Sequence, residues 1–113
     1  MRLLLLLSVV LVSTTALAKG PVKPAGPAFD KDAAANALRN VDLVKCKISG
    51  GPRGEGHVVV TFSTDGTTSD VQVDRGPFVK SPVERCIVSQ YKVAHIPAFV
   101  GDPVKVGKTF RID

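Results

Sequence analysis

The side chains most able to do chemistry in this 113-residue chain are its two cysteines, Cys46 and Cys86. They lie far apart in the sequence, and neither belongs to a C-x-x-C motif. In an exported protein an even number of cysteines predicts a disulfide, and two cysteines allow a single intramolecular connectivity. Closing a loop of about 40 residues would stabilise the fold by roughly 4 kcal/mol. A redox pair, a metal site and a free thiol are the alternatives to this structural disulfide.

His57 and His95 are the candidate metal-binding or catalytic residues. A zinc site normally gathers three or four ligands, so two histidines are too few once the cysteines are oxidised. Ser89, His95 and Asp102 include the residue types of a hydrolase triad, but no nucleophile-elbow motif accompanies them. The carboxylates show no pairing that is typical of acid–base catalysis. We therefore predict a protein that is not an enzyme and that uses no metal and no cofactor.

A glycine-rich segment, Ser49–Gly56, invites comparison with a phosphate-binding loop. Such a loop requires Lys followed by Ser or Thr after its last glycine, and it opens a helix. Here His57 and a run of valines follow, which predicts a strand. The segment is therefore expected to be a flexible connector.

The N-terminal residues 1–18 have the pattern of a cleaved signal peptide. Arg2 supplies the positive start, an apolar run extends from Leu3 to Leu17, and Ala16-Leu17-Ala18 is a cleavage motif. The run is shorter than the about 20 residues that span a bilayer, and an uncleaved anchor is the alternative. We expect a periplasmic or secreted protein with no stable membrane span after cleavage. It would consist of a Pro/Gly-rich lead (19–28) and one domain (29–113).

The formal net charge of +5 is the balance of 15 basic and 10 acidic residues. The longest basic cluster is Lys45-Cys46-Lys47, and aromatic residues are few. This pattern is typical of a solubilising surface and argues against nucleic-acid binding.

The segment Phe29–Leu43 has the apolar spacing of an amphipathic helix. Asp30 is placed as its N-cap, and Phe29 is placed to pack on Ala34 as a hydrophobic staple. The predicted apolar face consists of Ala34, Ala37, Leu38 and Val41.

A second helix is predicted to begin with Ser81 as N-cap and Pro82 at the first helical position, where Glu84 completes a capping box. Its face consists of Val83, Cys86, Ile87, Gln90, Tyr91 and Ala94. Most of this face is apolar, which indicates that it packs on the core.

The segment His57–Asp74 predicts a β-hairpin, with Asp65-Gly66 as a two-residue type I′ turn. In that register the opposed residues on one face are Val58 and Val73, Val60 and Val71, and Phe62 and Ser69. The hydrophobic pattern and the register therefore agree.

The last predicted strand, Val104–Ile112, alternates apolar and polar residues except at Lys108. The lysine predicts either a bulge or a place at the edge of the sheet. The order helix-β-β-helix-β predicts an α+β fold, with two helices packed on one face of a three-stranded antiparallel sheet.

The residues from the glycine-rich segment onward also carry a family resemblance. They are Gly56–Phe62, Asp65-Gly66, Val71–Val73, Pro77-Phe78, Pro82–Cys86, Val93–Pro97 and Lys108–Ile112. In order and spacing they resemble the TonB C-terminal domain, and more closely the short, Cys-containing TonB-like domains of myxobacterial proteins of the AgmX/PglI C-terminal type. The match runs from about Cys46 to Ile112, so residues 29–113 are interpreted as a TonB C-terminal-like domain.

This resemblance implies a binding function for the last strand, which in TonB pairs with a peptide of its receptor. The implied partner-binding edge consists of Val104, Lys105, Val106, Lys108, Phe110 and Arg111. We expect the partner to be an envelope protein or an extended peptide, added to the sheet by β-augmentation. The basic side chains would favour an acidic partner, or they are edge charges that prevent aggregation. The alternative is a structural or inhibitor-like secreted domain that presents the loop Gly50–Gly56.

Overall fold

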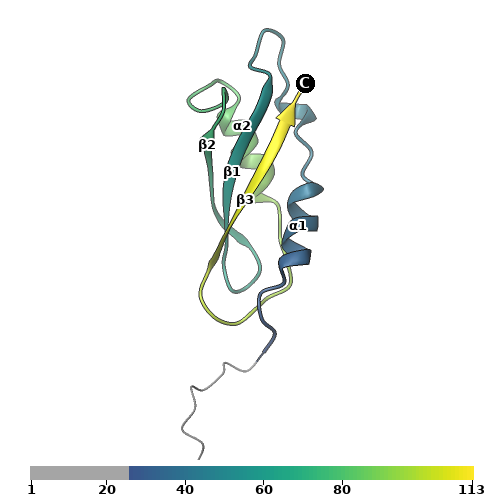
Figure 1. Cartoon of the computed structure of the whole chain (residues 1–113), viewed down its shortest axis with the longest axis vertical. Coiled ribbons are helices and arrows are strands. Elements are labelled where there is room, and N and C mark those ends of the chain that lie inside the picture. Colours follow the sequence, from purple (N-terminus) through teal and green to yellow (C-terminus); the bar gives the residue numbers. More distant parts are fainter. Residues whose placement is uncertain (1–25) are drawn as a thin grey trace, which may run out of the picture.

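Helices and strands follow one another in the predicted order in the computed structural model, which describes residues 26–113 (Figure 1). The elements are α1 (Lys31–Arg39), the 3-10 turn η1 (Val44–Cys46), β1 (Gly54–Phe62), β2 (Thr68–Arg75), α2 (Glu84–Lys92) and β3 (Val104–Ile112). The predicted signal peptide and most of the predicted lead lie outside the described residues. The order helix-β-β-helix-β confirms the predicted α+β fold.

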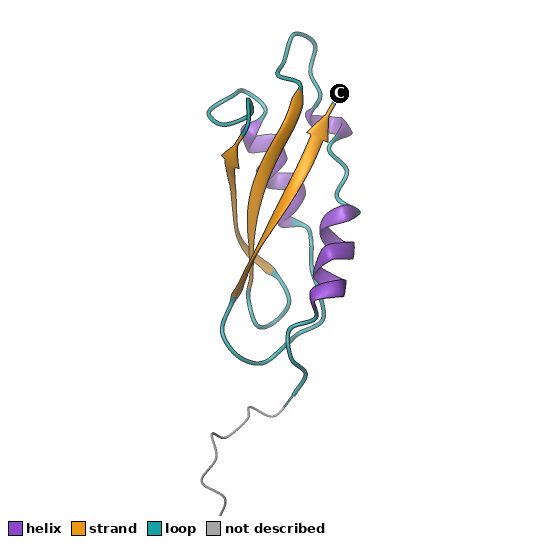
Figure 2. Ribbon diagram, in the orientation of Figure 1, coloured by secondary structure: helices purple, strands orange, loops and turns teal. Residues whose placement is uncertain are grey.

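The three strands form one antiparallel sheet in the order β2-β1-β3, with β1 in the centre (Figure 2). The predicted register is confirmed in the middle of the hairpin, where Val58 faces Val73 and Val60 faces Val71. Side chains alternate across a strand, so these four valines share one face. That face is buried.

The turn of the hairpin differs from the prediction. Phe62 faces Thr68 rather than Ser69, because the pairing shifts by one residue before the turn. A type I′ turn needs positive φ at both central residues, but only Gly66 has it, at 90°. The carboxylate of Asp65 instead accepts hydrogen bonds from the N–H (3.0 Å) and hydroxyl (2.7 Å) of the residue two positions on. Glycine in a left-handed position after a tight turn gives the longer hairpin loop that is seen here.

α1 starts as predicted and ends earlier. The side chain of Asp30 accepts an N–H of the first turn at 3.0 Å, which confirms it as the N-cap. The predicted end at Leu43 is wrong, since the helix ends at Arg39. The carboxylate of Asp42 accepts the N–H of Val44 at 2.9 Å. This local bond competes with helical bonding and opens η1 instead.

α2 begins at Glu84, so the predicted N-cap at Ser81 is wrong. The Glu84 N–H donates to the Ser81 carbonyl (3.2 Å) across a tight turn, and α-helical bonding begins with the Ile87 N–H and the Val83 carbonyl (3.0 Å). The Glu84 carboxylate accepts the N–H of Lys80, which has a positive φ of 61°. In place of the predicted capping box, the Glu84 carboxylate thus bonds to the N–H of Lys80, the residue before Ser81.

Both helices cover the same face of the sheet, and the core lies between them and that face (Figure 1). Buried side chains come from α1, η1, α2, the three strands and the loops beside them. They are Ala34, Leu38, Cys46, Val58, Val60, Phe62, Val71, Val73, Phe78, Val83, Ile87, Tyr91, Ala94, Ile96, Phe99, Phe110 and Ile112. Burial of this apolar area is the main contribution to folding.

A disulfide joins Cys46 of η1 to Cys86 of α2, as predicted, with an S–S distance of 2.11 Å and a Cα–Cα distance of 5.5 Å. It fastens the segment after α1 to the second helix. Within residues 26–113, neither helix has the length and apolarity that a membrane crossing requires.

Candidate binding edge and groove

β3 is an edge strand, with β1 as its one neighbour among the described strands. Its nine residues pair with β1 in a single register without interruption. Of the two explanations for Lys108, the bulge is therefore wrong and the edge is confirmed. An edge strand leaves alternate N–H and C=O groups without a partner strand, and these groups are a template for another chain.

The residues of the predicted edge lie on two faces of the sheet. Lys105 and Arg111 project from the open face and are exposed. Val104, Val106 and Lys108 lie on the face covered by the helices and are half-buried. An added strand would meet both sets, because its own side chains alternate in the same way.

Phe110, the sixth residue of the predicted edge, is a core residue. Its ring packs on the rings of Phe78 and Tyr91, with centroid distances of 5.3 and 6.0 Å. Gly56 faces it from β1, and a Cβ there would collide with both phenylalanine rings. The Phe110 ring is therefore held in the core and does not project outward from the strand as a separate contact for a partner.

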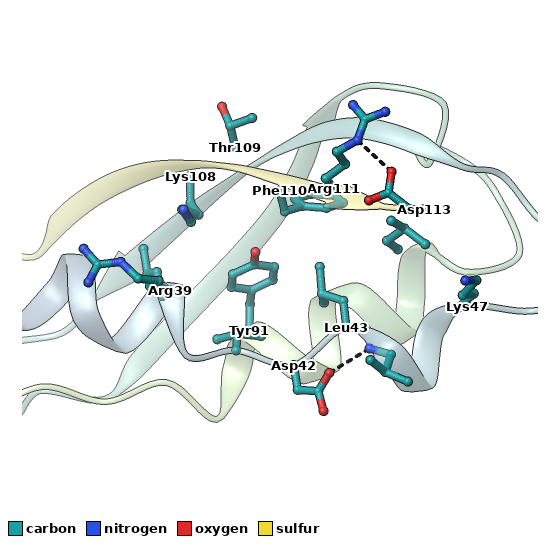
Figure 3. Close-up of a pocket in the computed structure, with 14 residues that line it drawn as sticks. Arg39, Asp42, Leu43, Lys47, Tyr91, Lys108, Thr109, Phe110, Arg111 and Asp113 are labelled. Carbon is teal, nitrogen blue, oxygen red and sulfur yellow. Dashed lines mark hydrogen bonds and ion pairs between the residues drawn. The ribbon is translucent and has the colours of Figure 1, made fainter.

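A groove of about 450 Å³ lies between the second half of β3 and the segment that follows α1. Its apolar lining includes Leu38, Val41, Leu43, Val44, Tyr91, Phe110 and Ile112, and its polar lining includes Arg39, Asp42, Lys47, Lys108, Thr109, Arg111 and Asp113 (Figure 3). This volume is in the usual range for ligand sites. The groove lies directly beside the backbone of the predicted edge.

Tyr91 contributes the phenol ring at the bottom of the groove, and its hydroxyl points toward β3 (Figure 3). The side chain is 1% exposed, and burial raises its pKa to about 12. None of the hydrogen bonds among the described residues involves this hydroxyl. No fully enclosed side-chain polar atom in residues 26–113 lacks a partner, so the hydroxyl retains contact with the groove.

The rim of the groove carries an excess of positive charge. Arg111 is paired with Asp113 at 2.7 Å, and Asp42 is bonded to a backbone N–H. Lys47 and Lys108 form no ion pair with any residue in the described part of the chain. The groove thus has a mixed apolar and polar lining, with two ammonium groups that have no ion-pair partner among residues 26–113.

The other residues with possible chemistry do not form a shared site. His57 lies on the open face of β1, and its Nδ1 is 2.7 Å from the carboxylate of Asp74, whose pKa this hydrogen bond lowers. His95 is exposed and bridges to the hairpin loop, while Ser89 and Asp102 are exposed on α2 and on the loop before β3. Residues 26–113 contain no group of three potential metal ligands.

The glycine-rich loop is shorter than predicted, because Gly54, Glu55 and Gly56 belong to β1. Arg53 folds over the remaining loop, and its guanidinium donates to the carbonyl of Ile48 at 2.9 Å. Two longer contacts of 3.4 Å reach other loop carbonyls. The loop is thus held by an arginine that the sequence analysis did not single out.

No protein-family model, curated protein or solved structure matches this chain. The resemblance to TonB-like domains therefore stays a prediction. The groove was also missing from the sequence analysis, which placed Tyr91 and Lys108 on separate elements. The signals that could have pointed to it are the single tyrosine of the chain on an apolar helix face and a lysine in the apolar phase of an edge strand.

Proposed function

We propose that this protein is exported, is not an enzyme, and captures an extended segment of an envelope protein or peptide by adding it to β3. The uninterrupted nine-residue edge of β3 carries the proposal. A segment lying along it would satisfy the outer N–H and C=O groups, and its alternate side chains would give specificity. In this it would act like the TonB-like domains that residues 46–112 resemble.

The charges on the edge argue against pairing with a second copy of the chain. If two copies paired in antiparallel fashion about Lys108, the two Lys108 residues would oppose each other. Lys105 of each copy would then oppose Arg111 of the other. Like charges directly opposite one another destabilise strand pairs. The same cations attract an acidic segment, which makes a different chain the favoured partner.

Export is supported by the disulfide together with the pattern of residues 1–18. Disulfides persist in the periplasm and outside the cell, and they are rare in the cytosol. The N-terminal sequence has the charge, apolar run and cleavage motif that a translocase and signal peptidase recognise.

Display selection with random peptides of nine residues, the length of β3, tests this function on residues 19–113. Bound peptides should slow hydrogen exchange at alternate amides of β3, as measured by NMR. Val106→Pro should abolish capture and leave the fold largely intact, while Val106→Thr keeps the N–H and should still bind. If Val106→Pro unfolds the protein, Lys105→Pro takes its place as the test. Neighbouring N–H groups point to opposite sides of a strand, so the N–H of Lys105 would then be the one that faces the partner. Binding that survives in a folded proline variant would count against the edge.

A second candidate function, presentation of the glycine-rich loop, is favoured by the bonds of Arg53. These bonds order a segment whose glycines would otherwise make binding costly in entropy. Arg53→Ala should release the loop. If this variant no longer captures peptides while the hydrogen exchange of the β3 amides is unchanged, the loop rather than the edge strand is favoured as the binding site.

A further inference from the structure

The groove beside β3 contains the hydroxyl of Tyr91, which belongs to a buried side chain, faces the groove and has no hydrogen-bond partner among residues 26–113. We propose that the groove takes a carboxylate side chain of the captured segment, held by the hydroxyl of Tyr91 and the ammonium of Lys108, with an apolar side chain beside it. This inference rests on the proposed function, because it concerns the segment that is added to β3.

The geometry of strand addition brings side chains to this place. A strand paired with β3 would lie about 4.8 Å from it in the plane of the sheet, and every second side chain would point to the helix-covered side. Lys108 and Phe110 mark that side of β3 and both line the groove. Side chains of the added strand on that side would therefore enter the groove between β3 and the residues after α1 (Figure 3).

The chemistry of the groove favours an anion with two acceptor oxygens. Tyr91 at neutral pH offers an O–H donor, and Lys108 offers an ammonium with three donors. A carboxylate accepts from both, and hydrogen bonds to a charged group contribute about 1.5–3 kcal/mol. A lysine or arginine of the partner would be repelled by Lys47 and Lys108, neither of which has a counter-ion among the described residues.

The apolar lining indicates what accompanies the carboxylate. Leu43 and Ile112 line the groove beside the tyrosine, and Val44 at its mouth is 73% exposed. Side chains two positions apart in an extended chain lie on the same side. The recognised pattern is therefore an acidic residue and an apolar residue separated by one position.

The sequences of the peptides obtained from the display selection test whether the groove takes a carboxylate. We expect Asp or Glu to be enriched at one position, with an apolar residue two positions away. Tyr91→Phe and Lys108→Gln should each weaken such a peptide by about tenfold or more. Lys92→Gln makes the same change of charge on an exposed part of α2 outside the groove, and it should leave affinity unchanged.

A matched peptide with Ala in place of the acidic residue, which removes both acceptor oxygens, separates this inference from the proposed function. Against the wild-type protein it should bind about tenfold more weakly, and Tyr91→Phe should weaken it no further. Peptides that protect β3 from exchange without a carboxylate preference, or without sensitivity to both groove variants, would overturn the groove site alone. A selection in which no peptide protects β3 would overturn the proposed function and the groove site together.

Discussion

Replacing Cys86 by serine should lower the stability of the domain by about 4 kcal/mol. The disulfide joins residues 40 positions apart, and cross-linking a loop of that length removes roughly this much free energy from the unfolded state. Native-state effects widen the expected range to about 2–5 kcal/mol. Since small domains are stable by only about 5–15 kcal/mol, the change is large.

The structure adds a local reason for this loss. Cys46 is 1% exposed, yet most residues around it from Asn40 to Arg53 are exposed or half-buried. Few other contacts therefore hold η1 against α2. Without the bond, the segment that forms one wall of the groove should separate from α2 before the sheet unfolds.

Thermal and denaturant unfolding of oxidised wild type, reduced wild type and Cys86→Ser give the measurement. The midpoint should fall by about 15–30 °C in the variant, because each kcal/mol shifts a domain of this size by about 4–8 °C. Reduced wild type is the matched control and should behave like the variant, since both lack the cross-link. An unchanged midpoint in the variant, or alkylation of two cysteines in unreduced protein, would refute the reasoning.

Three further predictions concern single groups. Tyr91 is the one tyrosine, so absorbance near 295 nm should show its phenol titrating near pH 12 in the folded protein and near 10 when unfolded. The raised pKa of Tyr91 stabilises the folded state below pH 10, and this stabilisation is lost as the pH rises to 12. It amounts to at most about 2 kcal/mol, because water in the groove screens part of the effect. Equal titration midpoints in the folded and unfolded protein would contradict this. The Asp74 carboxyl should titrate below pH 3.8 by NMR, because its hydrogen bond to His57 lowers its pKa. Its contribution to folding stability is therefore present above pH 3.8 and is lost as the pH falls below that value. In a His57→Gln variant the titration midpoint of Asp74 should move toward 3.8. Gly66→Ala should destabilise the fold by more than about 2 kcal/mol, since the φ of Gly66 is positive and a Cβ there would clash with the Ile96 carbonyl. Gly101→Ala is the control, with a positive φ but open space around the Cβ, and it should cost about 1 kcal/mol. Equal denaturation midpoints in the two variants would argue against the clash.

The strands and their register could be predicted because they depend on patterns that are local in sequence. Val71 and Val73 alternate with polar residues, and the hairpin register places Val58 and Val60 opposite them, so this register buries the four valines together. The strand Val104–Ile112 was found with correct bounds for the same reason. The ends of the helices were harder, because Asp42 and Glu84 could bond to more than one nearby N–H group.

The groove could not be predicted from sequence, because its parts come together only through tertiary packing. Tyr91 on α2, Lys108 on β3 and Leu43 before η1 belong to separate elements, and no motif relates them. Their positions depend on how the helices lie on the sheet. Once that packing is known, the Tyr91 hydroxyl and the Lys108 ammonium are found beside the edge strand, and neither has a hydrogen-bond or ion-pair partner within residues 26–113.

One backbone hydrogen bond determines how labels and fusions can be attached to this molecule. The N–H of Val100 donates to the carbonyl of Pro27 at 2.9 Å, which fastens the first described residues beside the loop that leads into β3. That loop lies at the far end of β3 from Asp113, which is part of the groove (Figure 1). An affinity tag or fluorophore fused after Asp113 would crowd the mouth of the groove, whereas one attached to the loop before β3 would lie at the opposite end of the strand.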